Sequence, residues 1–273
     1  MHRSKKRKSG GKNYFPDPSG LVLHFRNTND FYFKVIFCIE IWFMVIGNGL
    51  VARRFELYNR EDNFLVFASG VSNSKTKNPE AYNREMKLLK DCAQKYKTKS
   101  LIYFSTCSIY DPQENESAYV QHKLQIEEFI QTRIKQYHLF RISNLAGISS
   151  NQNTVLNFFF NHIKKGINFD LWTKACRNII DVDHAYFIID YILKNNLFPN
   201  QVINIANPVN YPVKKIITTI EIFLNIKSNY IEIDKGDCFE IDLSPIQHII
   251  QKQGIRFDPG YLMDLLNKYY QPA

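Results

Sequence analysis

Short runs of apolar residues alternate along most of the chain with stretches in which apolar positions recur every three or four residues. The short runs predict strands, and the recurring positions predict amphipathic helices. The predicted strands lie at 43–46, 64–68, 100–105 and 137–142, and the predicted helices at 50–58, 79–96, 117–135 and 154–165. Strands that alternate with helices are typical of a mostly parallel sheet covered by helices. The pattern therefore predicts an α/β fold.

Beyond about residue 145 the predicted elements are shorter and mixed. The pattern predicts strands at 202–205 and 230–233, and helices at 183–194, 212–224 and 244–252. We interpret this part as a smaller C-terminal lobe attached to the α/β core.

The first 43 residues differ in composition from the rest of the chain. They contain a basic tail, a Pro-Asp-Pro turn and an apolar run, and Met44 stands directly before the strand-like pair Val45 and Ile46. We therefore expect residues 1–43 to be a disordered or dispensable extension. The alternative is that residues 31–41 add a strand to the sheet.

Charge and hydropathy limit the choice of partners. The formal net charge is +9, but the first twelve residues hold six Lys or Arg and no carboxylate, so the remainder has only a slight positive excess. Such a balance does not support a basic nucleic-acid-binding face, although the tail alone is an alternative. The apolar stretch 31–46 is interrupted by Lys34 and Glu40 and is too short to span a bilayer. We therefore expect neither a nucleic-acid partner nor a membrane partner.

The cysteines carry no recognisable pattern. They are five in number and scattered, at Cys38, Cys92, Cys107, Cys176 and Cys238. No C-x-x-C pair and no metal-ligand spacing occurs among them. We therefore expect reduced thiols in a cytoplasmic protein, and no metal site.

A glycine turn follows the first predicted strand. Residues 47–52 have the spacing G-x-G-x-x-A, in which Gly47 makes the tight turn, Gly49 lets a pyrophosphate approach the backbone and Ala52 permits close helix packing. The backbone N–H groups that open the next helix then face the anion. The turn predicts a dinucleotide site, and its cofactor-binding residues are Gly47, Asn48, Gly49, Leu50 and Val51.

One part of the dinucleotide fingerprint is missing. No second strand ends in an acidic residue about 20 positions further on to hold the adenosine ribose. The chain instead reaches 64–70, which has the character of a later strand that borders the nicotinamide and adds Ser69 and Gly70 to the cofactor-binding residues. We therefore expect a shortened sheet without its second and third strands. Either the first helix then changes face, or the first connection is of the rare left-handed kind.

A Tyr-x-x-x-Lys pair opens the predicted helix 117–135. Its spacing places Tyr119 and Lys123 on one helix face. An ammonium beside a phenol favours the phenolate and lowers a tyrosine pKa that is ordinarily about 10. Tyr119 is therefore a candidate acid/base, and the preceding strand ends in hydroxyls that place Thr106 beside it. His122 turns away from this face, and we expect it at the surface.

Four segments resemble the extended short-chain dehydrogenase/reductases, of the NAD-dependent sugar-nucleotide epimerase/dehydratase type. Residues 105–110 resemble that family's S-[ST]-x-x-V-Y segment, and residues 140–147 are similar to its L-R-x-x-N-x-x-G segment. Residues 177–184 look like its R-x-x-x-H-V-x-D segment, and residues 202–206 match its V-x-N-[IL]-[AG] strand. The likeness keeps the motif order from about residue 44 to residue 225.

The resemblance implies a role for each of these residues. Thr106 would hydrogen-bond the reacting oxygen, Tyr119 would be the acid/base, and Lys123 would position ribose and lower the tyrosine pKa. The implied cofactor is NAD or NADP, which carries the hydride. The implied substrate-binding residues are Cys107, Ser108, Asn144 and Arg177, the last of which would meet the nucleotide diphosphate.

The chain departs from the family at two points. The 4,6-dehydratase branch carries an Asp-Glu pair directly after its catalytic Thr, where this chain has Cys107 and Ser108. We therefore do not expect elimination chemistry. Only twelve residues separate Thr106 from Tyr119, about half the interval of typical sugar epimerases, so the loop that covers the sugar is trimmed.

These observations predict a Rossmann-like doubly wound parallel sheet with a small C-terminal lobe. The nucleotide-binding core would comprise residues 44–145 with parts of 170–206, and the substrate lobe most of 146–273. The predicted activity is that of an NAD(P)-dependent epimerase or reductase acting on a nucleotide-sugar in surface polysaccharide synthesis. The alternative is a non-catalytic Rossmann-like binding or regulatory protein with weakened cofactor affinity. The oligomeric state is left open, a homodimer included.

Overall fold

The computed structural model describes residues 44–76 and 78–271. The predicted extension 1–43, the alternative strand at 31–41 and the first residue of the predicted strand 43–46 lie outside the described residues. Among the described helices, none is long and apolar enough to cross a membrane.

Five parallel strands form the central sheet. They are β1 (Val45–Ile46), β2 (Phe64–Phe67), β3 (Ser100–Thr106), β4 (Tyr137–Ile142) and β8 (Val202–Ile205), in the spatial order β1-β2-β3-β4-β8. The predicted α/β fold with a parallel sheet is confirmed. Val45 pairs with Val66, so β1 and β2 are direct neighbours. The loss of two strands relative to a full dinucleotide-binding sheet stays a prediction.

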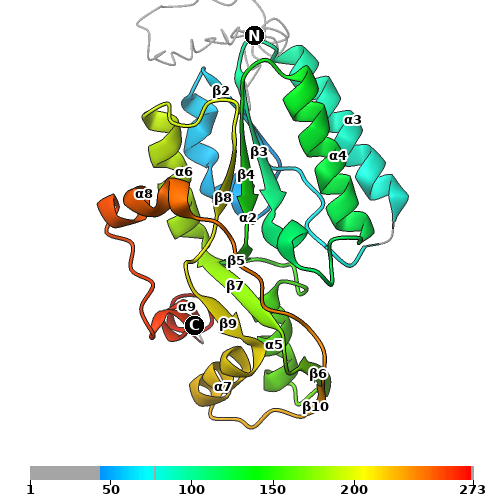
Figure 1. The fold of residues 1–273 in the computed structure, drawn as a ribbon, viewed down its shortest axis with the longest axis vertical. Coiled ribbons are helices and arrows are strands. Elements are labelled where there is room, and N and C mark those ends of the chain that lie inside the picture. The colour runs from blue at the N-terminus through cyan, green and yellow to red at the C-terminus, as the bar shows by residue number, and fades with distance from the viewer. Residues whose placement is uncertain (1–43, 77, 272–273) are drawn as a thin grey trace, which may run out of the picture. The chain divides into compact units, whose positions relative to one another are not determined.

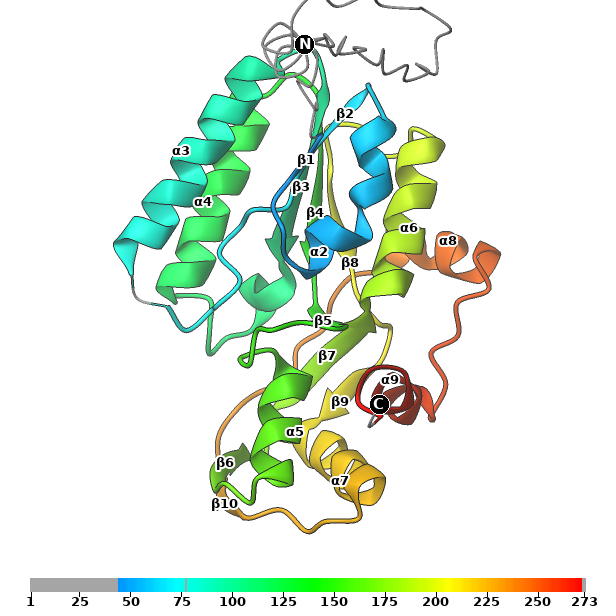
Figure 2. The ribbon, with the colours of Figure 1, turned by 180° about the vertical axis from the view of Figure 1, so that it is seen from behind.

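Helices cover both faces of this sheet (Figures 1 and 2). One face carries α3 (Pro79–Lys95) and α4 (Ala118–Arg133), and the other carries α2 (Leu50–Arg54), the 3-10 turn η1 (Glu56–Arg60) and α6 (Val182–Lys194). Local signals start the long helices, because the side chains of Asn78, Ser117 and Asp181 cap the first turns of α3, α4 and α6.

The connection from β1 to β2 has the opposite hand to its neighbours. The connections β2-α3-β3 and β3-α4-β4 step across the sheet in one direction and place their helices on one face. The connection β1-α2-β2 steps in the same direction, yet the ring of Phe55 after α2 packs 5.0 Å from that of Tyr186 on α6, on the other face. Right-handed connections would put all three helices on one face. The first helix therefore keeps its face, and the connection is the left-handed kind.

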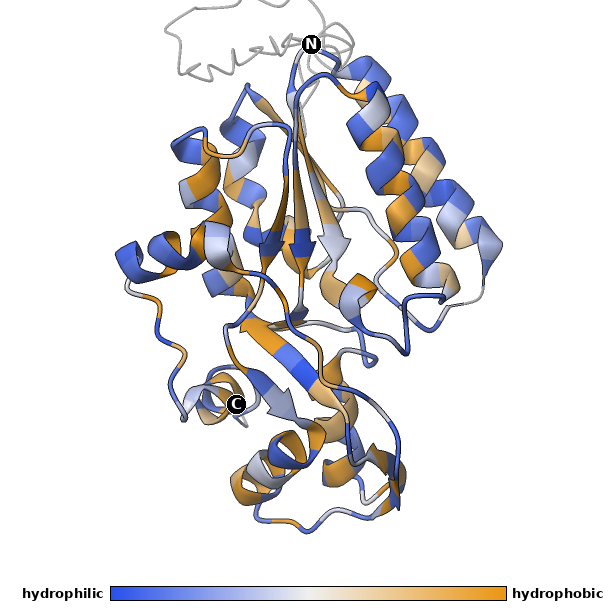
Figure 3. Cartoon of the chain, in the orientation of Figure 1, coloured by the Kyte–Doolittle hydropathy of each residue, from blue (hydrophilic) through white to orange (hydrophobic). Residues whose placement is uncertain are grey.

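The C-terminal lobe has its own small sheet and core. A three-stranded sheet consists of β5 (Asn144–Ala146), β7 (Cys176–Asp181) and β9 (Asn210–Pro212), while β6 (Phe169–Trp172) pairs with β10 (Tyr230–Ile233). Its helices are α5 (Val155–Lys164), α7 (Val213–Leu224) and α9 (Tyr261–Tyr269). The helix α8 (Gln247–Lys252) and the 3-10 turn η3 (Ser244–Ile246) pack against the central sheet and α6 instead, and the 3-10 turn η2 (Cys107–Tyr110) follows β3. Hydrophobic and hydrophilic residues alternate along α5 and α7 (Figure 3), whose buried residues share one cluster with α9.

The prediction of reduced thiols is wrong for two of the cysteines. Cys176 on β7 and Cys238 after β10 form a disulfide, with their Cα atoms 4.8 Å apart and a sequence separation of 62. The pairing arises because the segment after β10 runs beside β7, where Cys176 N donates to Asp237 O. No sequence spacing could show this neighbourhood. Cys92 and Cys107 are free and buried.

Candidate active site

A cavity of about 670 Å³ lies at the carboxyl ends of β1 to β4. This is the edge at which open parallel sheets bind their ligands. Of the residues predicted from sequence to form the site, those that line the cavity are Asn48, Gly49, Leu50, Val51, Ser69, Gly70, Thr106, Cys107, Ser108, Tyr119, Lys123 and Asn144. Gly47 and Arg177 are not among the lining residues.

The two glycines of the turn have different roles. Gly47 has φ +132°, and a Cβ there would lie 2.4 Å from the carbonyl oxygen of Ala68, so only glycine fits. Gly49 has no atom within 4 Å of the place where a Cβ would stand. The backbone at Gly49 is therefore open to the cavity. Gly47 does not line the cavity; its lack of a side chain lets the end of β1 pack closely against the backbone of Ala68 after β2.

The charge of the cavity suits an anionic ligand. Among the described residues that line it, Arg53, Arg84 and Lys123 are cationic and none is Asp or Glu. An open glycine backbone beside several cations fits the pyrophosphate of a dinucleotide. The residues present therefore fit NAD or NADP, although no carboxylate of the lining is placed to hold an adenosine ribose.

Thr106, Tyr119 and Lys123 meet in this cavity. Thr106 ends β3, where its Oγ1 accepts from Ser108 N at 3.0 Å and contacts Ser108 Oγ at 3.0 Å. Tyr119 lies in the first turn of α4 and is half-buried. The Lys123 Nζ atom is 5.9 Å from the centre of the Tyr119 ring. The helix spacing thus brings the phenol and the ammonium to one side of α4, as predicted.

Lys123 is buried and its ammonium is already engaged. Its Nζ donates to Glu85 Oε1 at 2.9 Å and to the Tyr103 hydroxyl at 2.8 Å. Glu85 is fully buried and also accepts from Tyr103 at 2.6 Å and from the Val71 backbone N–H at 2.7 Å. No motif in the sequence marks Glu85. Its one signal is a carboxylate at helical spacing on the apolar face of α3, where Glu85 is buried with Leu89 and Cys92.

His122 belongs to the same buried cluster. The prediction of a surface histidine is wrong, since His122 is 6% exposed and its Nε2 lies 3.1 Å from Glu85 Oε2. Its side chain points toward α3 rather than toward solvent, and it shares the Glu85 carboxylate with Lys123. Its ring packs 4.7 Å from that of Tyr82.

Opposing effects set the ionisation of Glu85. Burial by itself raises the pKa of this carboxyl group. Attraction to Lys123 and hydrogen bonds from His122 and Tyr103 outweigh burial and lower the pKa to about 2. Glu85 is therefore ionised at neutral pH. Burial and the adjacent Glu85 charge together raise the pKa of Tyr103 well above its usual value.

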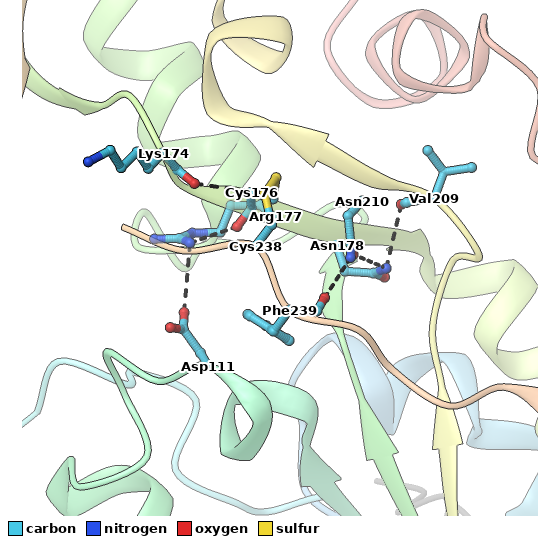
Figure 4. The surroundings of a disulfide bond; sticks show 9 residues. All are labelled: Asp111, Lys174, Cys176, Arg177, Asn178, Val209, Asn210, Cys238 and Phe239. Atoms are coloured by element: carbon cyan, nitrogen blue, oxygen red, sulfur yellow. Dashed lines mark hydrogen bonds and ion pairs between the residues drawn. A yellow bond between two sulfur atoms is a disulfide. The ribbon is translucent and has the colours of Figure 1, made fainter. Parts of the chain in front are cut away.

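Of the predicted substrate-binding residues, Cys107, Ser108 and Asn144 line the cavity and Arg177 does not. Cys107 Sγ donates to Arg141 O, and burial raises the pKa of this thiol to about 12. Asn144 lines the cavity, where its Nδ2 donates to Asn178 O at 2.8 Å. Arg177 lies outside the lining, with Nη1 2.7 Å from Cys176 O and 3.7 Å from Asp111 Oδ2 (Figure 4).

The disulfide lies beside a segment that reaches the cavity. Figure 4 shows Cys238 joined to Cys176 and followed by Phe239, whose carbonyl oxygen accepts from Asn210 Nδ2 at 2.7 Å. Phe239 and Ile241 line the cavity. One wall of the cavity is thus attached covalently to β7.

The fold and the cavity define a Rossmann-type α/β protein with a short-chain dehydrogenase-like Tyr/Lys pair. A family model described as the NAD dependent epimerase/dehydratase family matches residues 64–206. The chain belongs to this family, and the resemblance predicted from its motifs is confirmed. The match begins at β2, so the glycine turn lies before the matched region.

Solved structures with this fold share little sequence with the chain. The dTDP-glucose 4,6-dehydratase of Bacillus anthracis, solved with NAD, has a TM-score of 0.52 and 15% identity; the match covers 68% of this chain and 65% of the dehydratase. The ADP-L-glycero-D-manno-heptose-6-epimerase of Helicobacter pylori has a TM-score of 0.59 and 17% identity; the match covers 76% of this chain and 73% of the epimerase. RMD of Pseudomonas aeruginosa, complexed with NADPH, has a TM-score of 0.56 and 11% identity; the match covers 81% of this chain and 86% of RMD. No curated protein sequence matches the chain.

Proposed function

We propose that the protein is an NAD(P)-dependent epimerase or reductase that acts on a nucleotide-linked sugar. The observation that carries the proposal is the convergence of Thr106, Tyr119 and Lys123 on the cavity that the glycine turn also lines. Solved proteins of similar fold hold NAD or NADPH, and they include an epimerase and a dehydratase of nucleotide-sugars. The cytoplasmic location and the place in surface polysaccharide synthesis are part of this proposal.

Each side chain has a defined task in the proposed reaction. Tyr119 exchanges a proton with the sugar oxygen, and Thr106 donates a hydrogen bond to the same oxygen. An ammonium has three N–H donors, and Lys123 uses one each on Glu85 and Tyr103, which leaves one for the nicotinamide ribose. The bound nicotinamide supplies or accepts the hydride.

Elimination is not part of the proposal. A 4,6-elimination needs an acid and a base close to the catalytic threonine. Here the adjacent Cys107 thiol is buried with its pKa raised to about 12, and Ser108 is hydrogen-bonded to Thr106. Neither side chain supplies that pair.

The test begins with binding and continues with turnover. Calorimetric titration with NAD and NADP comes first, followed by a panel of nucleotide-sugars monitored at the nicotinamide absorbance. Tyr119→Phe should keep cofactor affinity and lose at least about 100-fold in turnover. Tyr191→Phe, a half-buried tyrosine on α6, is the matched control and should behave as wild type. Equal turnover in wild type and Tyr119→Phe would refute the mechanism.

A second candidate is a non-catalytic Rossmann-like binding or regulatory protein with weakened cofactor affinity. Two observations favour it: within the described part β1 pairs only with β2, and no carboxylate lines the cavity to hold an adenosine ribose. Absence of binding by both dinucleotides would support this candidate, and tight binding of either one would exclude it.

A further inference from the structure

Glu85 takes no part in the proposed proton transfer, although it lies beside Lys123. Its carboxylate is fully buried and accepts from Val71 N, Tyr103, His122 and Lys123. An ionised carboxylate is purely an acceptor, so all four contacts are satisfied together when His122 carries its proton on Nε2. The site beneath Lys123 is thus built for a negative charge.

The Glu85–Lys123 pair lies directly under the loop that follows β2 and contains Gly70 and Val71, here called the cofactor loop. A Cβ on Gly70 would lie 2.8 Å from Lys123 Nζ and 3.0 Å from Glu85 Oε1. The Glu85 carboxylate also holds the backbone of Val71, the next residue of the loop. Gly70 and Val71 both line the cavity. One carboxylate therefore sets the position of the loop and of the lysine.

We infer that Glu85 is a positioning residue that fixes Lys123 under the cofactor loop and offsets the ammonium charge that would otherwise act on Tyr119. The inference rests on the proposed function for the role of Tyr119 as acid/base. The physical step is electrostatic. Two opposite charges 2.9 Å apart act on a distant phenol as a dipole, whose potential falls with distance faster than that of one charge. The phenolate of Tyr119 therefore gains less from Lys123 than it would from an unpaired lysine.

Other titratable groups lie around this pair. His122 faces Glu85 from α4, Tyr103 faces it from β3, and the ring of Tyr82 on α3 packs against His122. Tyr119 interacts electrostatically with both Tyr82 and Tyr103. Burial keeps Tyr103 protonated, so near neutral pH the charges of this cluster are those of Lys123, Glu85 and any second proton on His122. Arg53 and Arg84 line the same cavity and add their charges equally in wild type and in every variant tested.

The direct test is the titration of Tyr119 in the cofactor-free protein. Tyrosine labelled with carbon-13 at Cζ reports each phenol by NMR, and Tyr119→Phe identifies the Tyr119 signal. Glu85→Gln keeps the size of the side chain and leaves the ammonium unpaired, so the pKa of Tyr119 should fall by about one unit or more. An unchanged pKa would overturn the inference.

Glu127→Gln is the matched control. Glu127 lies on the same helix as Lys123, is 2% exposed, and pairs with Arg141 rather than with Lys123. Its substitution should leave the Tyr119 titration close to that of wild type. An equal fall in both variants would mean that any buried carboxylate has this effect, which also overturns the inference.

A second comparison uses only variants that lack Lys123, so it serves if Glu85→Gln alone does not fold because it leaves a buried ammonium unpaired. Lys123→Met removes the cation and leaves Glu85 charged, so the pKa of Tyr119 should rise. The double variant Glu85→Gln/Lys123→Met removes both charges and should return the pKa toward the wild-type value. Identical values in the single and double variants would show that the Glu85 charge does not reach Tyr119.

These measurements need neither cofactor nor substrate. If the Tyr119 pKa falls in Glu85→Gln but the wild-type protein shows no turnover, the result counts against the proposed function alone. If the wild-type protein is active but the Tyr119 pKa is the same in Glu85→Gln and wild type, the result counts against the role of Glu85 alone. In an active enzyme, Glu85→Gln should also shift the pH profile of kcat/KM toward lower pH. Loss of a purely structural residue would not cause this shift.

Discussion

Lys268 on α9 donates a hydrogen bond of 2.7 Å to Asp181, the residue that caps α6. Asp181 also accepts from the Tyr269 hydroxyl at 2.7 Å and from Asp183 N at 2.8 Å. The last helix of the chain is thereby attached to the start of a helix that covers the central sheet. Asp181 is 3% exposed, so these partners replace water almost completely.

Removal of this carboxylate should destabilise the protein. Asp181→Ala loses the helix cap and leaves two donors of α9 without their acceptor, which together should cost about 2–3 kcal/mol in the free energy of unfolding. Urea unfolding followed by circular dichroism measures the change. Asp234→Ala removes an exposed ion pair with Lys174 and should cost less than about 1 kcal/mol. Equal losses would show that the α9 contacts contribute little.

The two glycines of the turn should respond in opposite ways to alanine. Gly47→Ala forces a Cβ against the backbone of Ala68 at φ +132° and should lower the free energy of unfolding by at least about 2 kcal/mol. Gly49→Ala meets no atom and should unfold as wild type, yet its methyl group enters the cavity and should weaken dinucleotide binding at least about tenfold. Unfolding curves and calorimetry measure the two effects. If Gly49→Ala binds the dinucleotide as tightly as wild type, the pyrophosphate does not lie against the glycine turn.

The disulfide should make stability depend on reductant. It closes a segment with a sequence separation of 62, so its reduction should lower the free energy of unfolding by about 2–4 kcal/mol. Cys238→Ser should unfold like the reduced wild type and should no longer respond to reductant. Cys92→Ser is the control, because Cys92 is free and buried and its variant should keep the response. Alkylation of Cys176 in unreduced, denatured protein would contradict the pairing.

Glu85 should also make the free energy of unfolding depend on pH in the acidic range. Its pKa is lowered from 4.5 to about 2 in the folded protein, so the unfolded chain takes up the proton first as the pH falls. The stabilisation is complete above about pH 4.5, where both states are ionised, and is lost progressively as the pH falls toward about 2, for a total of up to about 3 kcal/mol. Unfolding free energies measured across this range should fall less steeply in Glu85→Gln than in wild type.

A control for the acid prediction is Glu240→Gln, which changes an exposed carboxyl group. Its unfolding free energy should follow wild type across the same pH range. Parallel slopes in Glu85→Gln and wild type would show that protonation of Glu85 is not linked to folding.

The elements of the central sheet could be predicted because their signals are local. The predicted strand 137–142 coincides with β4, and the predicted helix 79–96 differs from α3 by one residue. Asn78 and Ser117 cap the two long helices through contacts with residues two and three positions away. Such contacts depend only on neighbouring residues, which the sequence displays directly.

The lobe was harder to predict because its strands are short and pair over long separations. The strands β5, β6, β7 and β9 and the helix α9 were not predicted. β5 has three residues, too few to show a period, and it pairs with β7 more than thirty positions further on. The disulfide between Cys176 and Cys238 has the same origin, since both residues need the lobe to be folded before they meet.

By itself, the sequence determined the α/β class, the order of the motifs and the placement of Thr106, Tyr119 and Lys123 around one cavity, because strand ends and helix spacing bring them together. Only the tertiary structure decided that the first connection is left-handed and that Glu85 lies beneath Lys123. Both features depend on which face of the sheet a helix covers. That choice is made by packing between segments far apart in sequence, which no local pattern encodes.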